Sequence, residues 1–138
     1  MRKKSSGFVR IRYAPSKGRV KGLVKKYLKD IKGKVGLKLA IIFGSYAKDS
    51  YSWGSDVDIF LVAKNLPKRV FERSEMLIDP DFPVQIELFA YTPEEFVRMI
   101  KDNHPLVNEV LQNGEIIYAN VEYKRFLRRL DRAEGFSL

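Results

Sequence analysis

The sequence predicts a small α/β domain (α+β in some classifications) in which a mixed β-sheet is covered by helices. The length of 138 residues suits one compact domain with a single core. Short apolar runs alternate with segments of helical periodicity, which is the pattern of strands followed by helices. Hydrophobic residues form 45% of the chain and charged residues 31%, a balance that excludes an intrinsically disordered protein.

Helices are predicted where apolar residues recur every three or four positions, and strands where apolar runs are short. Ser16 is a typical N-cap for the first helix, and Gly33 is a natural stop. Thr92, Pro93 and Glu95 have the pattern of a capping box at the start of a later helix. The predicted strands cover residues 37–43, 56–62, 84–89 and 116–118, and the predicted helices cover residues 16–33, 68–77, 92–103, 105–112 and 121–133.

The basic residues are concentrated at the start of the chain. Residues 1–36 contain 13 Lys or Arg and one acid, a net charge of +12, whereas residues 37–138 contain 13 bases and 16 acids, a net charge of −3. We interpret residues 1–15 as a basic N-terminal arm and residues 16–138 as a single domain. Such asymmetry attracts polyanions, namely nucleic acid, a triphosphate or an acidic protein face. The alternative is a basic surface that is simply solvated.

No segment has the length of a membrane span. The longest apolar run, at residues 39–43, suits a buried strand. The basic first residues are followed by Ser and Gly rather than by an apolar stretch, which argues against a secretory signal, and the chain has no cysteine. These features predict a protein that does not enter the membrane and that works in the cytoplasm.

The segment from residue 41 to residue 62 carries the strongest functional signal. Gly44 and Ser45 follow a buried strand directly. A glycine there lets the backbone turn sharply, and a serine can cap the next turn, so that backbone N–H groups are available to a phosphate. Asp56 and Asp58 then open the next strand. Side chains two residues apart share one face of a strand, about 7 Å apart at the backbone, which is close enough to chelate one metal ion or to bridge two.

Glu87 adds a third carboxylate on a later strand. It lies on the face opposite Val84, Ile86 and Leu88 in the predicted strand 84–89. Three carboxylates this close would repel one another unless cations neutralise them, and hard oxygen ligands favour magnesium or manganese. The alternatives are that the two aspartates are turn or cap residues and that Glu87 is a surface residue.

With this pattern the sequence resembles the minimal nucleotidyltransferases of the polymerase-beta-like superfamily. Their signature is a strand, Gly-Ser, about ten residues and Asp-x-Asp, with a third acid on a later strand. The resemblance implies that Asp56 and Asp58 bind two Mg²⁺ ions, with Mn²⁺ as an alternative, and that Glu87 binds the catalytic ion and receives the acceptor proton. It also implies that Gly44 and Ser45 hold the triphosphate of ATP.

Two positions depart from the pattern of the family, whose members often have Arg and Gly where this chain has Lys48 and Asp49. Lys48 can still bind a phosphate, though without the guanidinium fork. Asp49 would weaken nucleotide binding unless it faces away. In the same loop, Tyr51 and Trp53 could stack on a base or could pack against their own scaffold.

The resemblance also implies an activity and a partner. The expected reaction transfers a nucleotidyl group, AMP from ATP, to an acceptor hydroxyl. In several resembling families the acceptor is a tyrosine of a HEPN-class toxin, which the small enzyme modifies. One alternative is a non-catalytic antitoxin that neutralises its partner by contact, and another is a nucleotidyltransferase that acts on RNA.

Overall fold

A computed structural model describes residues 16–51 and 55–134 of the chain. The predicted basic arm, residues 1–15, lies outside the described residues. In chain order the elements are α1 (Lys17–Val35), β1 (Leu37–Phe43), β2 (Val57–Ala63), α2 (Val70–Leu77), β3 (Ile86–Tyr91), α3 (Pro93–Lys101), α4 (Pro105–Asn113), β4 (Glu115–Ala119) and α5 (Val121–Glu134).

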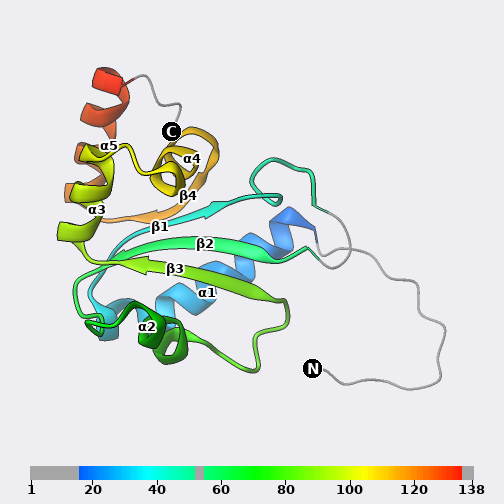
Figure 1. Cartoon of the computed structure of the whole chain (residues 1–138). Helices are drawn as coiled ribbons and strands as arrows, with labels where there is room; N and C mark the ends of the chain where they lie inside the picture. Colours follow the sequence, from blue (N-terminus) through cyan, green and yellow to red (C-terminus); the bar gives the residue numbers. More distant parts are fainter. Residues whose placement is uncertain (1–15, 52–54, 135–138) are drawn as a thin grey trace, which may run out of the picture.

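The strands form one mixed sheet in the order β3-β2-β1-β4. Strand β1 is antiparallel to both β2 and β4, whereas β2 and β3 are parallel. Figure 1 shows α3, α4 and α5 on one side of this sheet and α1 and α2 on the other. The predicted fold class, a small mixed sheet covered by helices, is therefore confirmed.

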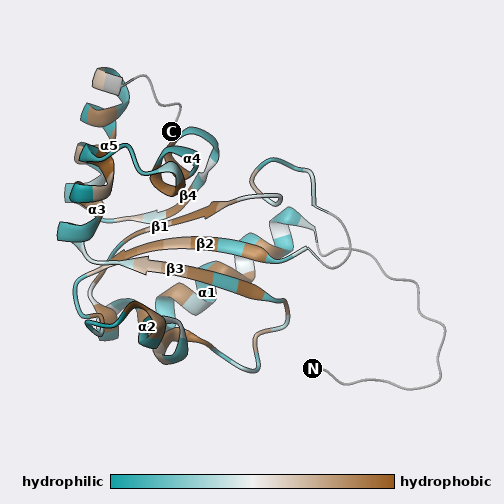
Figure 2. Cartoon of the chain, viewed as in Figure 1, coloured by the Kyte–Doolittle hydropathy of each residue, from teal (hydrophilic) through white to brown (hydrophobic). Residues whose placement is uncertain are grey.

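Both faces of the sheet are packed. One core layer joins β1 and β2 to α1 through residues such as Val24, Leu28 and Ile59. The other joins the same strands to α3, α4 and α5 through residues such as Phe60 and Phe96. Burial on both faces explains why β1 and β2 are almost continuously apolar, and Figure 2 shows this hydrophobic colouring along both central strands.

The first helix is longer than predicted. It continues past Gly33, which has open space around it, and ends where Gly36 adopts a left-handed conformation with φ of 63°. The Gly36 N–H donates a hydrogen bond to the Lys32 carbonyl oxygen, so Gly36 closes the last turn. A glycine alone does not end a helix when the next residues still have a buried face to cover, as Val35 does here.

The third strand is shifted by two residues relative to the predicted range 84–89. Its pairing with β2 begins at Val57 and Ile86 and continues to Val62 and Tyr91, so the neighbouring strand sets its limits. Thr92 then caps α3 through the predicted capping box. None of the described helices combines the length and the apolar character that crossing a membrane requires.

Candidate active site

The turn after β1 brings Gly44 against a carboxylate of the next strand. Gly44 has a φ of 75°, and a Cβ atom there would overlap Oδ2 of Asp58 and lie 3.2 Å from its Cγ atom. Only glycine meets both requirements, since other L-residues are strained at this φ and have a side chain to place. The Lys48 N–H donates to the Gly44 carbonyl oxygen at 3.1 Å, and the Ser50 N–H donates to that of Ser45 at 2.9 Å. The loop therefore folds back on itself beside Asp58.

The strand register brings two of the three predicted carboxylates together. Asp58 is paired with Phe43 of β1 on one side and with Glu87 of β3 on the other. Asp58 is half-buried, whereas Glu87 is exposed. Asp56 is also exposed. It lies one residue before β2, whereas the predicted strand 56–62 included it. The parallel pairing of β2 with β3 thus supplies the neighbourhood of acids that the sequence predicted.

The electrostatics of this corner are unfavourable to a negative charge. The pKa of Asp58 is raised to about 6, first by burial and then by the charges of Glu87 and Asp56 and a side-chain hydrogen bond with Glu87. Among the described residues, no three His, Cys, Asp or Glu side chains are already gathered as a metal site. The donor set nonetheless fits a hard cation, because carboxylate oxygens are its preferred ligands and a cation would relieve this repulsion.

Aromatic residues fix the loop that follows Gly44. The ring of Tyr46 is buried and stacks on that of Tyr51 at a centroid distance of 4.3 Å with an interplanar angle of 8°. The Tyr51 hydroxyl accepts a hydrogen bond from the Lys17 N–H at 3.3 Å. Tyr51 therefore packs against its own scaffold, which was one of the two interpretations of the sequence. Trp53 lies outside the described residues.

The two positions that depart from the family pattern each have an ionic partner. The Asp49 carboxylate lies 3.3 Å from the Lys17 ammonium. The Lys48 ammonium lies 3.0 Å from Oε2 of Glu109 on α4, and this hydrogen bond lowers the pKa of Glu109. The charge of Asp49 is thus balanced locally. Lys48 keeps half of its side chain exposed beside the turn.

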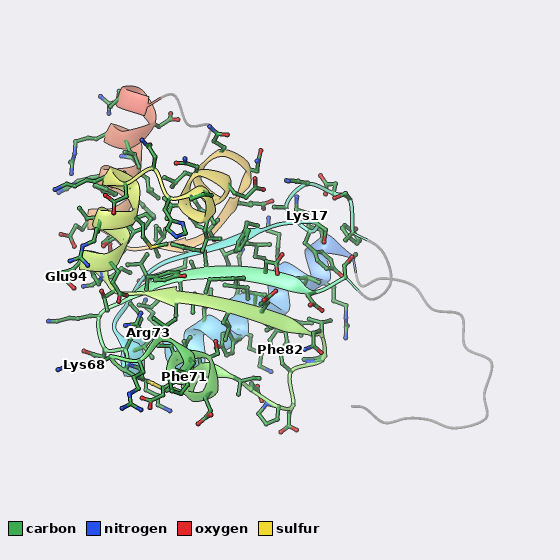
Figure 3. All side chains as sticks on the ribbon, in the orientation of Figure 1. Lys17, Lys68, Phe71, Arg73, Phe82 and Glu94 are labelled. Carbon is green, nitrogen blue, oxygen red and sulfur yellow. The ribbon has the colours of Figure 1, made fainter. Side chains whose placement is uncertain are left out.

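Lys17 is a structural residue of the site that the sequence did not single out. Besides Asp49, its ammonium contacts Glu115 of β4 at 3.0 Å and donates to the Ala47 carbonyl oxygen at 3.4 Å. The hydrogen bond with Glu115 is the largest cause of its raised pKa. A signal was present in the sequence, because a lysine in the first turn of a helix is opposed by the helix dipole and needs a compensating partner. Figure 3 shows Lys17 at the N-terminal end of α1, beside the loop after β1.

The arrangement corresponds to a known family. The sequence profile of the family described as "Polymerase beta, Nucleotidyltransferase" matches residues 24–123, which include the turn after β1 and all three carboxylates. The chain belongs to this family.

The chain is also similar to an individual relative and to solved structures. The chain is 32% identical to "Putative protein adenylyltransferase MJ1305" of Methanocaldococcus jannaschii, over 78% of each chain. A crystal structure of a "putative nucleotidyltransferase" from Sulfolobus solfataricus matches with a TM-score of 0.53 and 22% identity, over 75% of this chain and 84% of the other. A toxin–antitoxin structure with AMP-PNP matches with a TM-score of 0.54 and 18% identity, over 83% and 92% of the two chains. The structural matches support the fold.

Proposed function

We propose that this nucleotidyltransferase is a magnesium-dependent protein adenylyltransferase. The observation that carries the proposal is the register that places Asp58 beside Glu87, with the Gly44 turn packed directly against Asp58. This puts two carboxylates and a glycine turn at one corner of the sheet. The relative from Methanocaldococcus jannaschii, whose name is "Putative protein adenylyltransferase MJ1305", supports a protein as the acceptor.

Each predicted site residue has a role in this proposal. Asp56 and Asp58 would hold two Mg²⁺ ions, or Mn²⁺ as an alternative, and Glu87 would complete the site of the catalytic ion. Bound ions of this kind neutralise negative charge on the triphosphate and on the attacking and leaving oxygens. Gly44 and Ser45 would hold the triphosphate through backbone N–H groups and the serine hydroxyl. Lys48 would leave Glu109 to bind a phosphate oxygen when ATP is present.

The reaction follows from these roles. The acceptor hydroxyl oxygen attacks the α-phosphorus of ATP in line, a new oxygen–phosphorus bond forms, and the bond between the α-phosphorus and the bridging oxygen breaks to release pyrophosphate. Glu87 takes the proton of the hydroxyl. The chain mainly positions the reactants, which is the larger part of catalysis in phosphoryl transfer.

We further propose that the acceptor is a tyrosine of a HEPN-class partner protein. The toxin–antitoxin structure with AMP-PNP supports a pairing of this fold with a toxin and a nucleotide. Addition of AMP would place negative charge and bulk next to the partner's RNA-cleaving residues and would block them by repulsion.

Intact-mass spectrometry of the proposed HEPN-class partner tests this proposal. After incubation with this protein, ATP and magnesium, the partner should gain one or more AMP units, which peptide mapping should locate on tyrosine. The same incubation with Asp58→Asn is the matched control and should leave the mass unchanged. A stable complex without any mass shift would instead support neutralisation by contact, and nucleotides added to RNA would support an RNA-directed enzyme.

A further inference from the structure

The outer surface of α1 is the most strongly basic part of the described chain. The helix contains eight Lys or Arg and a single acid, Asp30. Its inner face is buried in the core through Val20, Val24 and Leu28. The exposed bases form what we call the basic strip, which consists of Arg19, Lys25, Lys26, Lys29, Lys32 and Lys34.

Most residues of the basic strip form no ion pair or ring contact with the rest of the described fold. Lys17 and Lys21 are bound by Glu115, and Lys32 lies 4.9 Å from the centre of the Tyr118 ring. By contrast, Lys25, Lys26 and Lys29 form no ion pair with any described residue. Lys25 and Lys29 are four residues apart and are therefore neighbours along the same face of the helix.

The backbone of α1 is also accessible next to these lysines. Nothing lies within 4 Å of a Cβ atom built at Gly18 or at Gly22. Glycine in a helix costs about 1 kcal/mol relative to alanine. No close packing contact at Gly18 or Gly22 compensates for this cost. An extended ligand could therefore approach the helix backbone closely between the flanking lysines.

The chemistry of the strip selects one class of ligand. Cores of protein–protein interfaces are rich in aromatic residues and Arg and poor in Lys, whereas this strip is mostly Lys with no exposed aromatic residue. A helix that binds a membrane surface inserts an apolar face, and the apolar face of α1 is already buried against the sheet. An array of point charges along about 22 Å of helix, from Arg19 to Lys34, suits a repeating row of phosphates.

We infer that α1 binds the phosphodiester backbone of a nucleic acid along the basic strip. The start of α1, from which the strip extends, lies beside the candidate active site, because Lys17 contacts Ala47 and Asp49 of the loop after β1. This binding is independent of nucleotidyl transfer, since none of the strip residues belongs to the proposed catalytic site. Phosphate contacts carry no sequence information, so binding should be strong at low salt and insensitive to sequence.

Fluorescence anisotropy with a labelled single-stranded RNA of mixed sequence tests the inference. The variant Lys25→Gln/Lys26→Gln/Lys29→Gln should bind about tenfold or more weakly at low salt. The negative slope of log affinity against log salt concentration should become shallower by about 2, as expected when three phosphate contacts are lost. DNA of the same sequence should bind with comparable affinity, and an RNA-only interaction would contradict recognition through phosphates.

The matched control removes the same charge from the other side of the sheet. Lys101→Gln/Lys124→Gln/Arg125→Gln changes exposed residues of α3 and α5 and should leave the affinity within about twofold. Asp58→Asn should bind RNA like the wild type, which separates this inference from the proposed function. Equal losses in the two triple variants, or no binding by the wild type at low salt, would overturn the inference.

Discussion

Gly44 is the residue on which the geometry of the candidate site depends most. Its positive φ turns the chain away from β1, and its missing side chain makes room for the carboxylate of Asp58. Among the described glycines, Gly22 provides the contrast, because it lies in a helix with open space around it. The same substitution should therefore have opposite effects at the two positions.

We predict that Gly44→Ala loses activity and stability together. A left-handed conformation costs an ordinary residue about 1–2 kcal/mol, and the added Cβ atom must displace Asp58. Gly22→Ala should instead stabilise the protein by about 0.5–1 kcal/mol through helix propensity. Urea unfolding of both variants, with an activity assay, checks the pair. An unchanged activity in Gly44→Ala would show that the turn does not position the site.

Glu87 should matter for turnover more than for nucleotide binding. Glu87 is exposed at the edge of the cluster of three carboxylates. We assign it to the proton of the acceptor hydroxyl. Glu87→Gln should therefore bind ATP with nearly normal affinity and react about a hundredfold more slowly or worse. Calorimetric titration with ATP and single-turnover kinetics separate the two effects. Joint loss of nucleotide binding and stability would identify Glu87 as a structural residue.

The predictability of individual residues depended on whether their role is local. Gly44, Asp58 and Glu87 could be found in the sequence, because a glycine directly after a strand and acids within apolar strands differ clearly from the apolar residues next to them. The partners of Lys17 could not, since its contacts join residues that are distant in the chain and depend on the packing of the elements. The proposed functions of the predicted residues remain predictions.

At the scale of elements, one buried arginine of α2 joins this helix to the end of β3 and to the start of α3. Arg73 is 3% exposed, and its guanidinium binds Glu95 with two hydrogen bonds of 2.6 and 3.1 Å. It also donates to the carbonyl oxygens of Pro67 and Ala90. Figure 3 shows Arg73 at the opposite end of the molecule from Lys17. The residue therefore holds the start of α3 and the end of β3 in place, away from the candidate site.

Arg73→Met should destabilise the protein by about 2 kcal/mol, because it removes two hydrogen bonds to the charged Glu95 and leaves buried carbonyl oxygens without their donor. Arg73→Lys keeps the charge but not the two-pronged geometry, so it should recover only part of the loss. Urea unfolding at neutral pH measures both effects. A loss below about 0.5 kcal/mol in Arg73→Met would show that the pair does not stabilise the fold.

The same ion pair predicts a pH dependence. Burial alone would raise the pKa of Glu95, but the hydrogen bonds from Arg73 and Thr92 outweigh it and lower the pKa below its ordinary value of 4.5. A lowered folded-state pKa adds stability above the unfolded-state value, and this is lost as the pH falls through the folded-state pKa. The stability difference between wild type and Arg73→Met should therefore be full near neutral pH and should shrink well below pH 4.5.

Element boundaries show what the sequence could and could not specify. The start of α3 was predictable because the capping box of Thr92 and Glu95 is a local signal, and the structure forms it. The end of α1 and the limits of β3 were not, because they follow from the helix face that must be buried and from the length of the neighbouring strand.

At the scale of the whole molecule, strand order decides which acids meet. The alternation of strands and helices indicated the fold class, but it gave no order or direction for the strands. The parallel pairing of β2 with β3 places Asp58 beside Glu87, while the antiparallel pairing of β1 with β2 places Gly44 beside Asp58. The candidate site is thus a product of topology, built from three segments.

Metal and nucleotide should stabilise the folded protein through this site. A ligand that binds only the folded state raises the melting temperature, and magnesium would also relieve the repulsion around Asp58. ATP with magnesium should therefore raise the melting temperature of the wild type and have little effect on Asp58→Asn. Thermal scans with and without a chelator check this. An equal rise in both proteins would place the ligand elsewhere.

Transfer of label from ATP labelled at the α-phosphate to the proposed HEPN-class partner tests the Asp56, Asp58 and Glu87 site most directly. The reaction is run with magnesium and either the wild type or the correctly folded Asp58→Asn variant. We predict label on the partner with the wild type and a reduction of about a hundredfold or more with Asp58→Asn. Normal labelling by Asp58→Asn would contradict the assignment of these carboxylates to catalysis.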